Sequence, residues 1–450
     1  MKGQIIDRVD SVFKLVLDFA ILGLLLLVAF FLSSALLNAF RNHLDSKFRL
    51  QRLARHVRRR VEDGSSFDLT INIPSFNEEN TIVQTVRSAL YAHYAYGDKT
   101  VQVIVDGATD RTFERLKDAF LLTEISHTTQ ETIPTKRLVS VWKSTVFREL
   151  FVYVKENGGK HDALNLGLNV SPASTVYSLN IDADTVLRND SIMRLSHRLI
   201  ANPSFAAVAG VVLPAYSDAS LKERWLSLLQ ICEYLASYHV TRSSQSLSKS
   251  LMIVSGAFGM FDYARIKGLG GYRKGLGEDM DMTLRLQEDY IVSGTGEVVF
   301  EPSAVAVTAS VSSVRDLVTQ RVRWFKGLLE NLMQFRQLFR FSFFGLTFLE
   351  YVIVEALMPL LIPIGVIYLG FYPEMAQQRI FYVSLFGIGV LYLLTVWSGL
   401  YYEATYRSVR KQTWLFALLL VVSVPLFSYC RYKAILSYQR KEWGEQEKHL

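Results

Sequence analysis

The sequence predicts an α/β domain with a largely parallel sheet, carried between blocks of membrane-spanning helix. Half of the 450 residues are hydrophobic and 12% are aromatic, which is more apolar than an ordinary soluble enzyme of this length. Long apolar runs lie near both ends of the chain. Between them, over residues 67–313, β-branched segments alternate with segments of helical periodicity, as in a three-layer α/β domain.

The N-terminal part, residues 1–42, is predicted to be a transmembrane anchor. Its run Phe19–Leu37 carries no charge and is long enough to cross the roughly 30 Å hydrocarbon core as a helix. A cleaved signal peptide is the alternative, but no small-residue cleavage pattern precedes the basic stretch that follows. Residues 43–66 form that basic juxtamembrane linker, which the positive-inside rule places in the cytoplasm.

The C-terminal part, residues 342–450, is predicted to be an all-α transmembrane region. It holds the apolar runs Phe343–Phe371, Ile380–Tyr402 and Trp414–Cys430. Three crossings from the cytoplasm would leave the basic C-terminal tail outside, against the positive-inside rule, so the number of crossings stays open.

Charge and cysteine content exclude other classes. The net charge is +7, but the basic excess gathers beside the apolar runs, which indicates a membrane surface rather than a nucleic-acid partner. The two cysteines, Cys232 and Cys430, are far apart in sequence, so neither a disulfide framework nor a thiolate metal site is expected.

The α/β domain opens with a predicted βαβ unit. Asp68–Pro74 and Val101–Val105 are β-branched runs, and Thr81–Tyr91 between them has helical periodicity. In such sheets, ligands collect beyond the carboxyl ends of the strands, where the segments containing Phe76 and Glu78 and then Asp106 fall. Simple turns would explain either segment alone.

A further predicted strand, Val176–Ile181, runs directly into Asp182-Ala183-Asp184. Two carboxylates one residue apart at a strand end can jointly hold a hard divalent cation such as Mg²⁺ or Mn²⁺, which neutralises a diphosphate. A solvated loop is the alternative.

Two helix starts carry charged residues that suit catalysis. Gly158-Gly159-Lys160 opens a predicted helix, where backbone amides and a lysine would attract a phosphate. Glu278 and Asp279 precede the predicted helix Met280–Gln287, and Asp279 can take a proton from an acceptor hydroxyl if Glu278 or an apolar neighbour tunes its pKa. A solvated lysine and a helix N-cap are the alternatives.

Residues 314–341 are predicted to form an amphipathic helix at the membrane interface, because apolar residues recur there at helical spacing. Gln320, Arg323 and Trp324 share one face of it. The arginine could hold a diphosphate and the indole could stack on a sugar ring. An interfacial Arg–Trp anchor would explain the same residues without catalysis.

Eight short strings occur in an order that resembles one family. They are PSFNE, DGATD, NGGKHDALN, DAD, SGAFG, GED, FEP and QRVRW. Together they resemble the membrane-embedded, processive family 2 glycosyltransferases, the group of hyaluronan, chitin, cellulose and poly-N-acetylglucosamine synthases. Val105 and Ala108 depart from the family, which often has an aspartate and a serine at these places.

The resemblance implies a GT-A-type (Rossmann-like) cytosolic domain and a role for each candidate residue. Asp279, beside Glu278, would be the general base on the acceptor. Gln320, Arg323 and Trp324 would hold the diphosphate and the acceptor-end sugar. The donor site would comprise Phe76, Glu78 and Asp106 at the uridine, Lys160 and Asp182 at the diphosphate, and Asp184 with Asp182 at Mg²⁺ or Mn²⁺.

The function implied is a processive, inverting β-glycosyltransferase that polymerises a UDP-activated sugar at the cytoplasmic face and extrudes the chain. The product would contain N-acetylglucosamine, as in poly-N-acetylglucosamine, chitin or hyaluronan. Its partners would be the UDP-sugar, the growing polysaccharide and the bilayer of the plasma or inner membrane, with room for accessory membrane subunits. The alternatives are a transferase adding one sugar to a lipid and a catalytically silent export or scaffold subunit.

Overall fold

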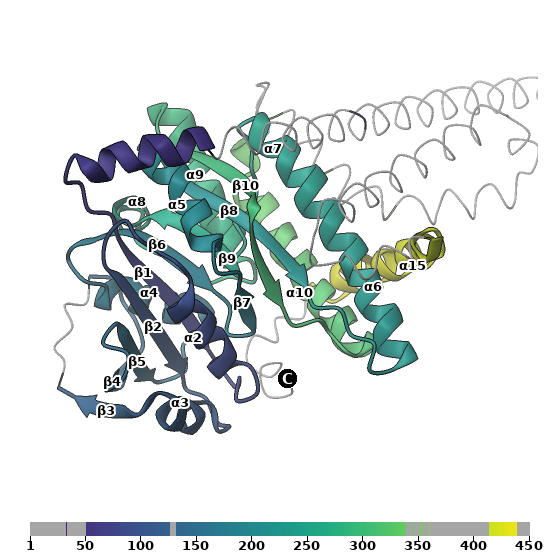
Figure 1. Cartoon of the computed structure of the whole chain (residues 1–450). Coiled ribbons are helices and arrows are strands. Elements are labelled where there is room, and N and C mark those ends of the chain that lie inside the picture. The colour runs from purple at the N-terminus through teal and green to yellow at the C-terminus, as the bar shows by residue number, and fades with distance from the viewer. Residues whose placement is uncertain are drawn as a thin grey trace, which may run out of the picture.

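The computed structural model describes residues 51–126, 132–338 and 414–438, together with the isolated positions 33, 345, 352 and 360. Its centre is one ten-stranded sheet with the order β3-β4-β5-β2-β1-β6-β9-β8-β10-β7 (Figure 1). The strands are β1 Asp68–Ser75, β2 Lys99–Asp106, β3 Leu122–Ile125, β4 Leu138–Ser144, β5 Leu150–Lys155, β6 Thr175–Ile181, β7 Thr185–Leu187, β8 Phe205–Pro214, β9 Phe258–Asp262 and β10 Glu297–Thr308.

The predicted βαβ opening is confirmed. β1 and β2 pair in parallel, with Ile71 opposite Val101, and α2, Ile82–Tyr91, connects them. β6 adds to the other side of β1, also in parallel, so the predicted strand at residues 176–181 is confirmed as well. The carboxyl ends of β5, β2, β1 and β6 therefore lie at one edge of the sheet.

The sheet is mixed, and the expectation of a largely parallel sheet is wrong. Among the described strands four neighbouring pairs are parallel and five are antiparallel. β9 runs antiparallel to both β6 and β8. The error has a simple cause: a strand buried on both faces has the same apolar sequence in either direction, so its composition does not report its direction.

Helices cover both faces of the sheet. Successive residues of a strand point to opposite faces. In β2, Val103 packs in one core cluster with Val86 of α2, whereas its neighbour Ile104 packs in another with Leu166 of α4. The remaining helices of the domain are α3 Thr112–Phe120, α4 Lys160–Val170, α5 Ser191–Ala201, α8 Tyr263–Gly268 and α9 Glu278–Ser293.

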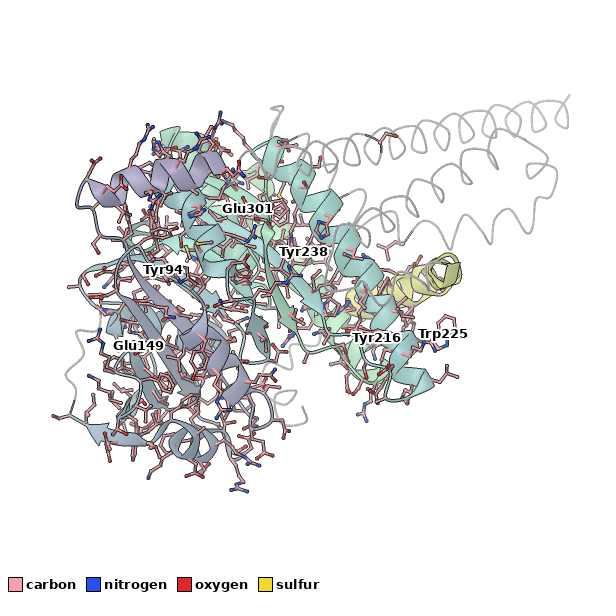
Figure 2. The ribbon with its side chains drawn as sticks, viewed as in Figure 1. Tyr94, Glu149, Tyr216, Trp225, Tyr238 and Glu301 are labelled. Carbon is pink, nitrogen blue, oxygen red and sulfur yellow. The ribbon has the colours of Figure 1, made fainter. Side chains whose placement is uncertain are left out.

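A second group of helices lies beside β8 and β10 (Figure 1). α6, Leu221–Leu235, continues through the π-helical turn η1, Ala236–Arg242, into α7, Ser243–Leu247. Figure 2 labels Tyr216 and Trp225 near the start of α6 and Tyr238 in η1, where the Tyr238 ring lies 6.4 Å from Phe300 of β10. α10, Val314–Gln334, packs against α6, α9 and α15, Trp414–Leu436, and is followed by the 3-10 turn η2, Arg336–Leu338.

Part of the predicted juxtamembrane linker is a helix docked on the domain. Residues 51–62 are helical, and Val57 is fully buried in the main core. Arg60 donates to the Ile200 carbonyl at 2.6 Å, and its guanidinium lies 5.2 Å from the Phe67 ring. The basic segment therefore has an apolar inner face as well as a charged outer one.

The predicted membrane runs are mostly beyond the reach of the structure. Apart from the isolated positions, Phe19–Leu37, Phe343–Phe371 and Ile380–Tyr402 lie outside the described residues, whereas Trp414–Cys430 falls within α15. Within the described part of the chain, no helix has the length and apolar character needed to cross a membrane.

Candidate active site

The candidate site is built at the sheet edge where β1, β2 and β6 end. The loops after β1 and β2 are bonded to each other: the Asn77 side-chain oxygen accepts the Thr109 amide at 2.8 Å, and the Asp110 carboxylate accepts the Glu79 amide at 3.1 Å. Asn77 has a φ of +56°, which an asparagine tolerates better than most residues. These bonds fix the segment that carries Phe76 and Glu78, both half-buried.

Glu78 lies in the electrostatic field of the two aspartates that follow β6. Burial raises the pKa of the Glu78 carboxyl to about 7, although a hydrogen bond from the Thr81 hydroxyl at 2.6 Å opposes the shift. The negative charges of Asp184 and Asp182 raise this pKa further. The structure thus brings Glu78 and the Asp182-Ala183-Asp184 segment together.

Lys160 joins the end of β6 to the start of α9. Its ammonium lies 2.5 Å from an Asp182 oxygen and 3.3 Å from a Glu278 oxygen. Burial lowers the pKa of Lys160, but the charges of Asp182, Glu278 and Asp279 outweigh it and leave the pKa above its ordinary value. The two carboxylates hold the ammonium between them, and about a third of the Lys160 side chain stays exposed.

Lys160 begins α4 as the sequence predicts. Gly159 precedes it with a φ of +89°, a conformation that favours glycine. The Gly159–Lys160 turn therefore presents the first amides of α4 together with the ammonium group, the arrangement that attracts a phosphate.

Glu278 and Asp279 are the first two residues of α9, and the cap position belongs to Gly277. Asp279 accepts the Gly256 amide at 3.2 Å on one oxygen and the Met280 amide at 2.8 Å on the other. Burial raises the pKa of Glu278, opposed by Lys160 and reinforced by Asp279. Helix N-caps were the alternative for this segment, and neither carboxylate takes that position.

The surroundings of Asp184 suit a bound cation, because they offset its negative charge only in part. Its carboxylate accepts hydrogen bonds from the Thr308 and Thr185 hydroxyls, both at 3.1 Å. Burial and the Asp182 charge raise the Asp184 pKa, and Lys160 only partly offsets them. In the described part of the chain no three His, Cys, Asp or Glu side chains form a metal cluster. Two carboxylates still fit Mg²⁺ or Mn²⁺, because such ions commonly complete their shell with substrate phosphates and water.

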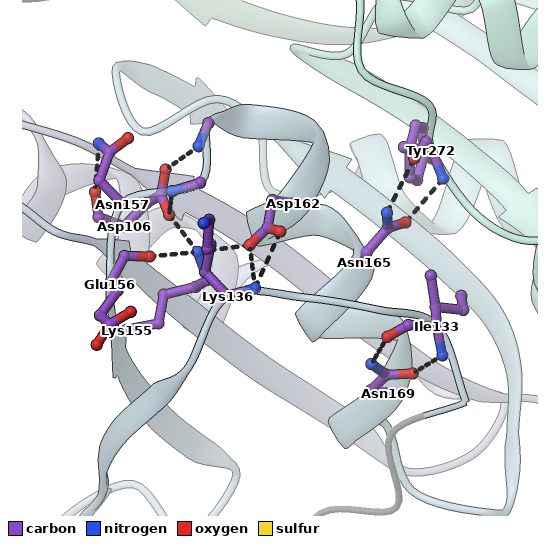
Figure 3. A network of polar contacts seen from close by, with 12 residues as sticks. Asp106, Ile133, Lys136, Lys155, Glu156, Asn157, Asp162, Asn165, Asn169 and Tyr272 are labelled. Atoms are coloured by element: carbon purple, nitrogen blue, oxygen red, sulfur yellow. Dashed lines mark hydrogen bonds and ion pairs between the residues drawn. The ribbon is translucent and has the colours of Figure 1, made fainter.

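Asp106 holds the backbone just before Lys160, and Figure 3 shows its carboxylate with the bonds that it makes. It is only 3% exposed, and its carboxylate accepts the Gly158 and Gly159 amides at 3.0 and 2.8 Å. Lys155, fully buried, lies 2.5 Å from Asp106 and 2.6 Å from Asp162. The predicted contact of Asp106 with uridine stays a prediction. In the structure, the hydrogen bonds of Asp106 hold the turn before Lys160.

Gln320, Arg323 and Trp324 lie on α10, on the face that also carries Gly327 and Asn331 at helical spacing. That face contacts the segment leading into α9. Asn331 donates to the Gly277 carbonyl at 3.1 Å, and a side-chain carbon on Gly327 would meet Leu276 at 2.9 Å. The close approach at Gly327 sets α10 directly against the turn that precedes Asp279.

Several residues of the site were not predicted. Gly256 and Arg321 lie within the family-like strings, but neither was assigned a role from the sequence. Lys155 and Thr308 lie outside those strings. Each acts through a partner far along the chain: Gly256 is 23 residues from Asp279, and Thr308 is 124 residues from Asp184. The one local signal was the glycine of the SGAFG string, since a glycine beside a charged cluster often marks a close approach.

Comparison with known proteins decides the family. A family model described as glycosyl transferase family group 2 matches residues 179–429, more than half of the chain. The chain belongs to glycosyl transferase family group 2. The family 2 resemblance inferred from the sequence strings is therefore confirmed.

Two curated relatives are polysaccharide synthases. The poly-β-1,6-N-acetyl-D-glucosamine synthase of Staphylococcus epidermidis is 29% identical over 264 residues, covering 58% of this chain and 54% of that protein. Chitin synthase A of Aspergillus oryzae is 25% identical over 297 residues, covering 59% of this chain and 16% of that protein. The family 2 chain thus spans about half the length of the first relative and a smaller part of the second.

A solved structure shows the same fold. The mannosyltransferase PcManGT from Pyrobaculum calidifontis, in complex with GDP-Man and Mn²⁺, superposes with a TM-score of 0.52 at 16% identity, covering 92% of this chain and 99% of that one. The family 2 domain therefore has a GT-A-like α/β glycosyltransferase fold with a mixed sheet. The predicted fold class is confirmed, whereas the prediction of a largely parallel sheet is wrong.

Proposed function

We propose that this protein is a processive, inverting β-glycosyltransferase that polymerises a UDP-activated, N-acetylglucosamine-containing sugar. The observation that carries the proposal is the position of the Lys160 ammonium, 2.5 Å from Asp182 and 3.3 Å from Glu278, beside Asp279. A phosphate-attracting cation and the proposed base would thus share one site. The curated relatives that make poly-N-acetylglucosamine and chitin support the choice of product class.

The donor would bind with its diphosphate at Lys160 and its uridine toward Phe76, Glu78 and Asp106. Asp182 and Asp184 would hold Mg²⁺ or Mn²⁺. The ion, when bound, supplies positive charge that stabilises the departing diphosphate. Lys160 adds a positive charge at the same place, and its partly exposed side chain can turn from Asp182 toward the phosphate.

The reaction is a single displacement at the anomeric carbon. Asp279 accepts the proton of the acceptor hydroxyl, and the hydroxyl oxygen forms the new bond to the anomeric carbon. The bond from that carbon to the β-phosphate oxygen breaks, its electron pair stays on the phosphate, and UDP leaves. The Gly256 amide, 3.2 Å from one Asp279 oxygen, holds the carboxylate in orientation.

The acceptor would lie between the start of α9 and α10. Gln320, Arg323 and Trp324 would hold the diphosphate and the terminal sugar of the growing polysaccharide. Trp324 is 40% exposed, which leaves aromatic surface for stacking on a sugar ring.

The catalytic domain would face the cytoplasm of a plasma or inner membrane, with the polymer passing through a channel of the C-terminal helices in the bilayer. The basic stretch after the first apolar run supports this orientation. Accessory membrane subunits could associate with those helices.

The test is UDP release by the full chain, purified in detergent, with Mg²⁺ or Mn²⁺ and a panel of single and paired UDP-sugars. Product size on a gel separates the outcomes. Long product from UDP-N-acetylglucosamine supports the proposal, a requirement for UDP-glucuronate as well changes the product to a hyaluronan-like polymer, and a single sugar on lipid favours the lipid transferase. If no donor gives UDP release, the protein is a catalytically silent export or scaffold subunit.

Asp279→Asn checks the base directly. The variant keeps the shape of the side chain but cannot take the proton, so we expect turnover to fall about 10²–10⁴-fold with UDP binding retained. Asp289→Asn, on the same helix but paired with Arg265, is the matched control and should leave turnover unchanged. Full activity of Asp279→Asn would remove this residue from the base role.

A further inference from the structure

Arg321 is the buried arginine in the segment that carries Gln320, Arg323 and Trp324. It is 6% exposed, whereas Arg323 is exposed to solvent and Trp324 is 40% exposed. A buried guanidinium is costly unless partners satisfy its charge and its N–H groups. Its partners therefore show what the burial achieves.

The first partner is Glu233 near the end of α6, 88 residues earlier in the chain. The Arg321 Nε donates to both Glu233 oxygens, at 2.9 and 3.0 Å, and Nη2 donates at 2.5 Å. Contacts through both Nε and Nη2 fix the plane of the guanidinium as well as its position, because the fork of donors matches the carboxylate.

The second partner is Gln320, the neighbouring residue. Arg321 Nη1 donates to the Gln320 side-chain oxygen at 2.5 Å. Since an arginine can only donate, the oxygen of the Gln320 amide must face it. The NH₂ group of Gln320 is then turned away from Arg321, where it can donate to an oxygen of a sugar or a phosphate.

The third partner is the Trp324 ring. The guanidinium carbon of Arg321 lies 4.2 Å from the ring centroid, within the range of a cation–π contact. Tyr234 of α6 lies 6.3 Å from the same ring. Trp324 thus has a charged and an aromatic neighbour while part of its surface stays exposed.

We propose that Glu233 and Arg321 form a positioning pair that sets Gln320 and Trp324 for binding the acceptor sugar. The proposal rests on the function proposed above. Arg321 does not touch the acceptor itself. It determines which group Gln320 presents and how the Trp324 ring is oriented, and Glu233 determines where Arg321 lies.

The alternative is a purely structural role for the pair. Arg321 also lies 6.0 Å from the Phe427 ring of α15, so the pair would then serve to hold α6, α10 and α15 together. A joining role predicts lost stability with every activity falling together. A positioning role predicts a selective loss in the use of acceptor.

The test uses Arg321→Lys in the full chain, which keeps a positive charge opposite Glu233 but lacks the planar fork. The assay contains UDP-N-acetylglucosamine, Mn²⁺ and soluble N-acetylglucosamine oligomers. We expect the Kd for UDP to stay close to wild type, while the KM for the oligomer rises about ten-fold and more UDP is released per sugar incorporated. Glu233→Gln should shift the same quantities in the same direction.

Arg265→Lys is the matched control. Arg265 lies 3.3 Å from Asp289, and neither residue is on α10, so this variant should leave the oligomer KM unchanged. A wild-type oligomer KM in Arg321→Lys overturns the proposal. So does a parallel loss of UDP binding and thermal stability in both the Arg321 and Glu233 variants, which would make the pair a structural join. Wild-type UDP release in the same assay tests the proposed function separately.

Discussion

At the scale of single residues, Gly256 shows how tightly the charged cluster is packed. A side-chain carbon at this position would lie 2.9 Å from the Lys160 ammonium and 3.6 Å from the Asp279 Cβ. The atom that must move is the end of a flexible side chain, so the backbone can stay in place. Lys160 would then leave its position between Asp182 and Glu278.

We predict that Gly256→Ala lowers kcat/KM for the UDP-sugar about ten-fold, while the protein still folds, because the displaced cation no longer meets the diphosphate in the right place. Steady-state UDP release and a thermal unfolding curve measure the two quantities. Gly268→Ala is the control, since a side-chain carbon there meets nothing within 4 Å. Equal kcat/KM values for the two variants would show that the position of Lys160 does not limit turnover.

The candidate residues differ in how well the sequence could predict them. Lys160, Asp182 and Asp279 could be singled out because each stands at a strand end or a helix start, and these positions have local signals. Arg321 was passed over in favour of Arg323, because its burial comes from Glu233, 88 residues away on another helix. Burial created by a distant partner leaves no local pattern.

At the scale of elements, the start of α4 depends on charges buried beneath it. Lys155 is enclosed with Asp106 and Asp162, and these carboxylates in turn accept backbone amides, Gly158 and Gly159 at the first and Lys136 at the second. Asp106 and Asp162 therefore hold two chain segments around one lysine.

We predict that Asp106→Asn and Asp162→Asn each destabilise the protein by about 2 kcal/mol, less than the ~3–5 kcal/mol typical of removing one partner of a buried pair, because Lys155 keeps the other carboxylate. Both should also weaken UDP binding, since the Lys160 turn loosens. Thermal unfolding and a UDP titration by calorimetry measure these effects. If Asp106→Asn weakened UDP binding with no loss of thermal stability, the carboxylate would act on the nucleotide directly.

Strand direction is the element-scale property that the sequence did not reveal. β1, α2, β2 and β6 were predicted correctly from periodicity and turn residues. β9 lies between β6 and β8 in the sheet, although α6, η1 and α7 separate β8 from β9 along the chain. That long excursion lets β9 enter the sheet antiparallel to both neighbours, and the five residues of β9 carry no sign of it.

At the scale of the whole molecule, His197 links the loop before β2 to α5. It is 5% exposed, and its Nε2 lies 2.5 Å from the Tyr96 hydroxyl. Burial lowers the pKa of His197, with Glu301 opposing the shift and Arg194 adding to it. Folding therefore favours the neutral imidazole, whereas the unfolded chain has a histidine pKa of about 6.5.

The sign of the pH dependence follows from that difference. Because the folded pKa lies below the unfolded one, the unfolded chain binds the proton more readily, and His197 contributes its full stability only above about pH 6.5. This contribution is lost as the pH falls toward the folded pKa, at no more than about 1.4 kcal/mol per pH unit.

We therefore predict that the melting temperature of the wild type falls more than that of His197→Gln between pH 7.5 and pH 5.5, by about 2 °C. His56→Gln, at an exposed position, is the control and should follow the wild type. Parallel curves for the wild type and His197→Gln would mean that His197 is protonated equally in the folded and unfolded chains, so that its bond to Tyr96 does not depend on a neutral ring.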